Sequence, residues 1–216
     1  MKNRPTELYL IGGITGLLGG IFMFMPSYLS IFHVHAAHLG SPDLKLVGIA
    51  HGFSVVSLIL ITPAVFALFA LLKSTSATRS YLGLGFALLW IGIGIVGHLS
   101  QTAPLRTLSE FYDKPPSRET AMLIYHFSEE FWEALSRTST FFAVLMSLCY
   151  GLALIKSWNR PSGYLFLLAI IAFPIGFLIP QIDVQLHIIV RSLGFIFAAG
   201  ALIKIAASKA ESDAPV

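Results

Sequence analysis

Six long apolar blocks, each about as long as a membrane-spanning helix, dominate this sequence of 216 residues. A bilayer core about 30 Å thick needs roughly 20 apolar residues per helix. The blocks lie near residues 8–32, 46–72, 81–100, 138–155, 164–179 and 184–205. Only 12% of the residues are charged, whereas soluble domains carry about 25%. The sequence therefore predicts an all-α, polytopic membrane protein. One bundle of six transmembrane helices covers residues 1–205, and a polar, disordered tail follows at residues 206–216.

The distribution of lysine and arginine among the connecting segments predicts the orientation, because basic segments stay in the cytoplasm. The side that holds both termini carries eight of these residues: Lys2, Arg4, Lys73, Arg79, Lys156, Arg160, Lys204 and Lys209. The other side carries four: Lys45, Arg106, Lys114 and Arg118. Both termini are therefore predicted to be cytoplasmic. We expect the membrane to be the inner (plasma) membrane of a bacterium. Because the basic residues flank the apolar blocks, we expect a lipid bilayer as partner and no nucleic acid.

The fourth apolar block is preceded by a polar stretch without a helix breaker. No proline or glycine occurs between Ser117 and Tyr150. Ser117 is a suitable N-cap, and Glu119 is favourable in the first turn. This predicts one helix about 55 Å long, with a polar first half that projects beyond the hydrocarbon. The residues before it, 101–118, form the longest predicted loop, which could act as a lid.

The first block contains glycines at every fourth position, which give two overlapping GxxxG patterns. Gly12, Gly16 and Gly20 therefore share one face that another helix can approach closely. We expect this face to be used for packing within the molecule. A homo-oligomer that forms through the same face is the alternative.

The predicted topology places all seven histidines toward the non-cytoplasmic side. Counting about 20 residues from the cytoplasmic end of each span puts three of them at one depth, near the outer edge of the hydrocarbon. These three are His51, His98 and His187. The other four lie farther out: His33, His35, His38 and His126.

Two predicted helices carry polar residues at helical spacing. One set shares a face of the fourth helix through steps of three and four: His126, Glu129 or Glu130, Glu133 and Arg137. The other set follows steps of four on the last helix: Asp183, His187 and Arg191. Arg191 lies about one turn inside the hydrocarbon, where a charge is costly unless it is paired. We expect Glu133 to be its partner, with the two polar faces meeting across the bundle interior.

Three kinds of site are compatible with these residues. The first is a zinc or non-haem iron site with His51, His98, His187 and Glu133 as ligands, or with Glu130 in place of Glu133. The second is haem, held by His51 and His98. The third needs no metal and is a proton relay or a polar pocket, since histidine titrates near neutral pH. No HExxH, HxxxH or Glu-x-x-His motif is present. A purely structural role for these polar groups stands beside all three.

The sequence favours a membrane-embedded enzyme, with or without a metal, that acts on a lipidic or small apolar substrate near the outer leaflet. Glu130 and Glu133 are the expected acid/base or ligand groups. The other catalytic candidates belong to the same two polar faces: His126, Arg137, Asp183 and Arg191. The alternatives are a haem-binding redox protein, a proton-linked transporter or channel, and an accessory subunit of a membrane complex.

Three short motifs accompany this layout. The first helix opens with Leu-Tyr-Leu-Ile-Gly-Gly at residues 8–13, the second ends with Ala-Leu-Leu-Lys at residues 70–73, and the fifth contains Gly-Tyr-Leu-Phe-Leu at residues 163–167. Over most of its length the chain resembles a family of uncharacterised bacterial membrane proteins with six transmembrane helices. The resemblance implies a six-helix fold and brings no established chemistry.

Overall fold

The computed structural model describes residues 4–37, 44–111, 118–157, 159–178 and 186–212. Within these ranges the chain forms six α-helices and no strand. In chain order they are α1 (Arg4–Ala37), α2 (Leu44–Leu72), α3 (Ala77–Phe111), α4 (Arg118–Lys156), α5 (Arg160–Leu178) and α6 (Leu186–Ser212). The all-α prediction is confirmed.

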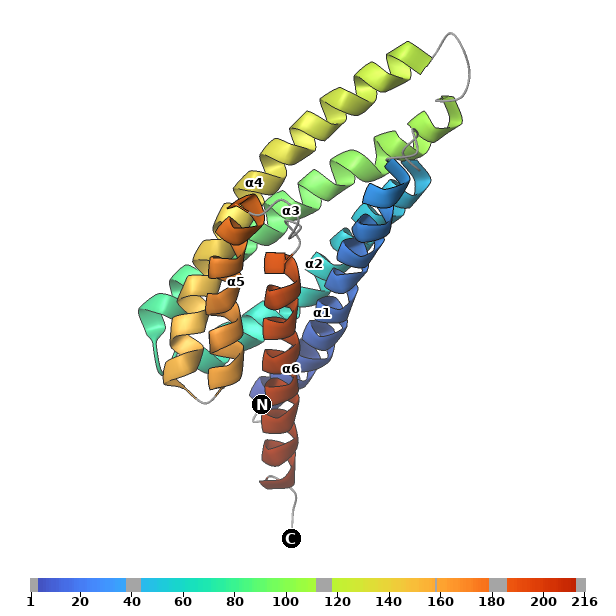
Figure 1. Cartoon of the computed structure of the whole chain (residues 1–216). Coiled ribbons are helices and arrows are strands. Elements are labelled where there is room, and N and C mark those ends of the chain that lie inside the picture. Colours follow the sequence, from blue (N-terminus) through green and yellow to red (C-terminus); the bar gives the residue numbers. More distant parts are fainter. Residues whose placement is uncertain (1–3, 38–43, 112–117, 158, 179–185, 213–216) are drawn as a thin grey trace.

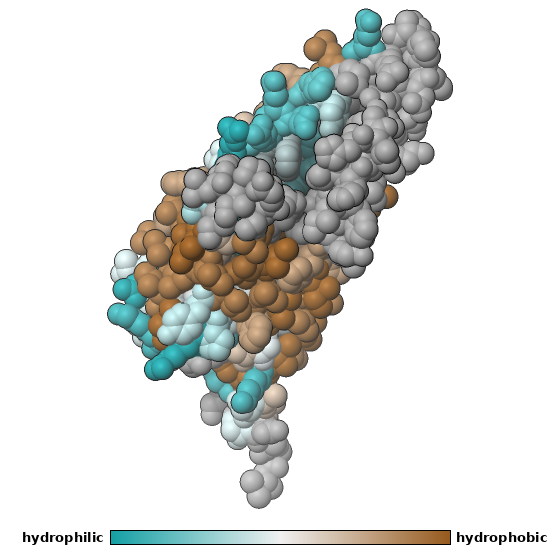
Figure 2. Space-filling view, viewed as in Figure 1, coloured by the Kyte–Doolittle hydropathy of each residue, from teal (hydrophilic) through white to brown (hydrophobic). Residues whose placement is uncertain are grey.

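Among the described residues, five helices are long and apolar enough to cross a membrane. The five stretches are Thr6–Phe24, Gly48–Leu72, Ala77–Thr102, Leu123–Lys156 and Leu186–Ala210. The apolar stretch of α5, Arg160–Pro174, is shorter. Figure 2 shows an apolar band across the visible face, with hydrophilic residues above and below it. Large side chains such as Ile11, Ile59 and Phe66 are exposed on the outside. The chain is therefore a helical integral membrane protein.

The described helices form a closed ring. Each helix packs against the next one along the chain, and α6 packs back against α1. A smaller contact joins α2 and α6. Consecutive helices run in opposite directions, and the N- and C-termini lie at the same end of the bundle (Figure 1). At the other end, α3 and α4 extend beyond α5 and α6 (Figure 1).

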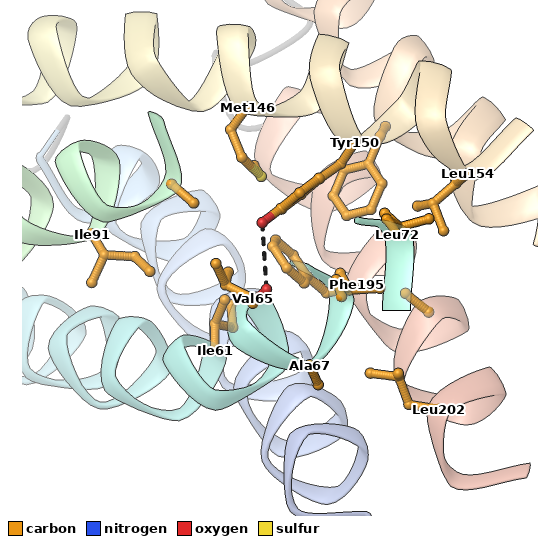
Figure 3. Packing of buried hydrophobic residues seen from close by; sticks show 14 of the residues in the cluster. Ile61, Val65, Ala67, Leu72, Ile91, Met146, Tyr150, Leu154, Phe195 and Leu202 are labelled. Carbon is orange, nitrogen blue, oxygen red and sulfur yellow. Dashed lines mark hydrogen bonds between the residues drawn. The ribbon is translucent and has the colours of Figure 1, made fainter. Parts of the chain in front are cut away.

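The half of the bundle nearest the termini, which we call the basal half, is filled by apolar side chains (Figure 3). Its fully buried side chains come from five helices and include Val65, Leu72, Ala87, Tyr150, Leu154, Phe166 and Leu202. At its upper limit the Phe195 ring stacks on Trp90, with centroids 5.9 Å apart, and meets the edge of Phe166 at 5.0 Å. The Tyr150 hydroxyl donates a hydrogen bond to the Val65 carbonyl oxygen at 3.4 Å, which joins α4 to α2 (Figure 3). Close packing of this kind holds helices together where the lipid offers no hydrophobic driving force.

Glycines on α1 let this helix approach two neighbours. A Cβ atom added to Gly12 would lie 2.5 Å from the Cβ of Ala67, and one added to Gly16 would lie 2.7 Å from the Cβ of Ala64, both on α2. A Cβ on Gly20 would lie 2.7 Å from an isoleucine side chain of α6. The predicted use of this face for packing within the molecule is confirmed. The alternative, a homo-oligomer that forms through the same face, stays a prediction.

Two helices continue far into segments that were predicted to be a loop or a disordered tail. α3 continues to Phe111 instead of ending near residue 100, so residues 101–111 of the predicted loop are helical. α6 continues to Ser212, so residues 206–212 of the predicted disordered tail are also helical. Hydropathy marks where a helix leaves the bilayer, and a polar helix can continue beyond that point. The rest of the predicted lid, at residues 112–117, lies outside the described residues. The long fourth helix is confirmed, since α4 is unbroken over 39 residues.

Candidate functional site

Two of the predicted site residues meet directly in the other half of the bundle, which we call the distal half. His51 lies near the start of α2 and His98 lies in α3, and their Nδ1 atoms are 2.9 Å apart. This distance is that of a hydrogen bond. One imidazole must therefore carry a proton on Nδ1, and the other must accept it. The prediction that these two histidines lie at one level is consistent with this contact.

The histidine pair is covered by an aromatic ring from a third helix. The Trp132 indole on α4 meets the His51 ring edge to face, with centroids 5.2 Å apart, and lies 6.5 Å from the His98 ring. Gly97 allows this approach, because a Cβ there would lie 3.3 Å from the Cβ of Leu135. Three helices thus converge on one small cluster of imidazoles and indole. The sequence did not connect Trp132 with His51 and His98.

Polar side chains also join α3 to α4 beside this cluster. The buried Gln101 amide donates to both the carbonyl oxygen and the hydroxyl of Ser128, the latter at 2.9 Å. Lower down, the Ser139 hydroxyl donates to the Trp90 carbonyl oxygen at 3.1 Å. The sequence did not indicate the contact between Gln101 and Ser128, because Gln101 was predicted to lie in a loop. Gln101 follows His98 by three residues, which puts both on one face once the helix is known to continue.

Arg191 lies inside the bundle, where it is only 3% exposed. Its guanidinium carbon sits 5.5 Å from the centroid of the Trp90 ring, which is itself stacked on Phe195. Two of its nitrogens, Nε and Nη2, are buried and have no hydrogen-bond partner among the described residues. The positive charge therefore lies against an aromatic face, and within the described part of the chain these two nitrogens donate to no acceptor.

The predicted ion pair between Glu133 and Arg191 does not form. Glu133 instead accepts a hydrogen bond from Arg137, one turn along the same helix. Both side chains are largely exposed, Arg137 by 72% and Glu133 by 53%. The carboxylate thus takes the local partner that helical spacing supplies. The two polar faces do not meet across the interior, because these α4 groups lie on the exposed surface.

The remaining predicted residues divide into exposed, buried and undescribed ones. His126 and Glu129 form an exposed contact of 3.9 Å on α4, and Glu130 is exposed beside them. His187 is buried and meets the Phe173 ring edge to face, with centroids 5.3 Å apart. The side chains of four predicted residues lie outside the described residues: His33, His35, His38 and Asp183.

The predicted metal site is not assembled in the described part of the chain. No three histidine, cysteine, aspartate or glutamate side chains gather there as a metal ion would need. Of the predicted ligands, His51 and His98 bond to each other, His187 packs on an aromatic ring, and Glu133 pairs with Arg137. The two Nδ1 atoms are 2.9 Å apart, which leaves no room for a metal ion between them, because two bonds of about 2 Å need about 4 Å. The haem alternative stays a prediction.

A scan of protein-family models and searches of curated proteins and of solved structures found no match to this chain. No family assignment follows, and the resemblance of layout described above stays a resemblance.

Proposed function

We propose that this protein is a membrane-embedded enzyme that performs general acid–base chemistry on a lipidic or small apolar substrate. The observation that carries the proposal is the hydrogen bond between His51 and His98 inside a membrane-spanning bundle. Two imidazoles that share one proton can accept a proton on one ring nitrogen and deliver another from a different one. This chemistry needs no metal.

The surroundings of the histidine pair favour an apolar substrate. Trp132 offers a flat aromatic surface next to both imidazoles. The outside of the bundle is apolar, with exposed side chains such as Val56 and Val96 on the helices that carry the histidines. A substrate dissolved in the bilayer could therefore approach between helices. A buried polar group within a membrane protein is costly and is typical of functional sites.

The proposed enzyme spans the membrane six times, with both termini in the cytoplasm. α5 has 19 residues, which at 1.5 Å per residue is close to the thickness of the bilayer core, and it packs between α4 and α6. Basic residues gather at the basal ends of the helices: Lys73, Arg79, Lys156, Arg160, Lys204 and Lys209. By the positive-inside rule, that end faces the cytoplasm. The site then opens toward the outer leaflet, and we assign the protein to the inner membrane of a bacterium.

The basal half argues against a transporter or channel. A transported solute needs a polar path through both halves of the bundle. The described interior of the basal half is instead closed by side chains with 0% exposure, among them Tyr150, Phe166 and Leu202. Side chains of this size would have to move apart to open a path.

Solvent deuterium provides the test. The purified protein is incubated in D₂O with a total bacterial lipid extract, and the lipids are analysed by mass spectrometry. In acid–base catalysis, one group removes a proton from the substrate, and a deuteron that comes from the solvent is delivered to it. We expect one lipid class to gain deuterium or to be converted. His51→Gln and His98→Gln should each slow this reaction roughly 100-fold or more.

Thr62→Val is the matched control, because Thr62 lies on α2 and bonds only to the backbone of its own helix in the described structure. This variant should react like the wild type. The proposal is wrong if no lipid exchanges or turns over, or if both histidine variants keep the wild-type rate.

A further inference from the structure

Arg191 has an unused pair of donors with a defined geometry. Nε and Nη2 are the two nitrogens without a partner among the described residues. Both lie along one edge of the planar guanidinium, so their hydrogens point in nearly the same direction. This edge is the fork that arginine uses for two oxygens of one carboxylate or phosphate. The unsatisfied atoms are therefore the pair that one oxyanion would satisfy.

The groups that contact Arg191 do not replace such an anion. Trp90 stabilises the positive charge through its ring face, 5.5 Å from the guanidinium carbon. A ring face accepts no hydrogen bond along the guanidinium edge. No oxygen of the described residues accepts a hydrogen bond from Nε or Nη2. A cation buried in a bilayer is rarely left without an acceptor, and the two donors thus indicate a missing partner.

The surroundings also restrict what the partner can be. Arg191 is 3% exposed, and Trp90, Phe195 and Val190 around it are apolar and buried. An oxyanion held there is shielded from water, where charge-assisted hydrogen bonds are strong. The rest of the ligand must tolerate an apolar interior. Trp90 and His98 are eight residues apart on α3, about 12 Å along the helix, so an extended molecule could reach from Arg191 toward the histidine pair.

We infer that Arg191 binds the acidic head group, a carboxylate or a phosphate, of an amphiphilic ligand with an apolar body. The inference rests on the proposed function for its expectation of a lipidic substrate in the distal half. It adds that this substrate is an acid, and that Arg191 positions it while the histidine pair moves the proton.

Native mass spectrometry of the detergent-solubilised chain tests the inference with four probes. Decyl phosphate and decanoate carry an oxyanion on an apolar chain, decanol is the neutral match, and inorganic phosphate is the free anion. We expect the wild type to retain both acidic amphiphiles in preference to decanol and to inorganic phosphate. Arg191→Gln should weaken their binding at least tenfold and leave decanol unchanged. Arg191→Lys should recover only part of the affinity, because an ammonium group lacks the fork.

Two further variants keep the result interpretable. Asp183, eight residues before Arg191, lies outside the described residues. If Asp183→Asn binds the amphiphiles and the wild type does not, the partner of Arg191 is within the chain and the inference is wrong. Trp90→Phe keeps an aromatic face and should retain most of the binding even if Arg191→Gln does not fold.

The remaining outcomes separate this inference from the proposed function. If inorganic phosphate binds as tightly as decyl phosphate, the ligand need not be an amphiphile, and the inference is wrong. Binding that does not depend on Arg191 would overturn the site itself. His51→Gln and His98→Gln should keep amphiphile binding while they lose deuterium exchange. Arg191-dependent binding without any exchange in the wild type would leave the binding site standing and remove the acid–base function alone.

Discussion

The two halves of the bundle are packed in different ways, although the same helices run through both. In the basal half, interlocking apolar side chains fill the ring, and Tyr150, Phe166 and Leu202 are completely buried. In the distal half, the contacts between helices include imidazole, amide and hydroxyl groups, and two nitrogens of Arg191 have no hydrogen-bond partner among the described residues.

This difference indicates which half of the bundle stabilises the fold and which half carries energetically costly groups. Lipid chains are as apolar as a protein interior, so membrane helices associate through close packing and a few polar contacts. Tight apolar packing in the basal half, with few polar contacts between helices such as the Tyr150 hydrogen bond, can hold the helices in place. That rigidity lets the distal half carry a buried cation and paired imidazoles, which stability alone would not select.

The largest effect should come from removing a ring at the boundary between the two halves. Phe195 is 0% exposed and contacts both Trp90 and Phe166. Phe195→Ala should lower the free energy of unfolding by about 3 kcal/mol or more, because the cavity cannot collapse inside a ring of helices. Unfolding of the purified protein in a denaturing detergent titration measures this. Phe197→Ala is the control on the same helix, since Phe197 is 52% exposed. Equal losses for both would mean that the interior is not the main source of stability.

A smaller loss should follow from adding one methyl group to the close contact between α1 and α2. The Cβ of Gly12→Ala would lie 2.5 Å from Ala67 Cβ and 2.9 Å from the Pro63 carbonyl oxygen. Neither atom is at the end of a flexible side chain, so the helices must move apart, at a cost of about 2 kcal/mol. Gly200→Ala meets nothing within 4 Å and should not lower stability. If Gly12→Ala were harmless in the same titration, the glycine face would not set the helix spacing.

Much of the basal half could be predicted from sequence, because its signals are local. The length of an apolar block and the spacing of Gly12, Gly16 and Gly20 each indicate a helix or a packing face without reference to the rest of the chain. The closed ring of helices was not predicted, since hydropathy carries no information about which helices are neighbours. The polar end of α3 was missed for a related reason: outside the bilayer, helix and loop have similar composition.

The distal half could be predicted only in part. Depth along each helix placed His51 and His98 at one level, and the structure brings them into contact. Depth does not fix how each helix is rotated about its axis, and rotation decides which side chains meet. That is why Glu133 was assigned to Arg191 although it bonds to Arg137 on its own helix. A partner four residues away is available in any helix, whereas a partner on another helix depends on tertiary packing.

The smallest effect is expected from that exposed pair, and it sharpens the contrast with the buried groups. Arg137 and Glu133 are 72% and 53% exposed, so water and salt screen their attraction, and such pairs contribute about 0.5 kcal/mol or less. Glu133→Gln should therefore change the free energy of unfolding by no more than this, and less at high salt. Gln101→Leu, which removes a buried amide bonded to Ser128, should cost about 1 kcal/mol or more. The same detergent titration compares the two variants. A larger loss for Glu133→Gln would mean that the exposed charges of α4, and not its buried hydrogen bonds, hold the distal half together.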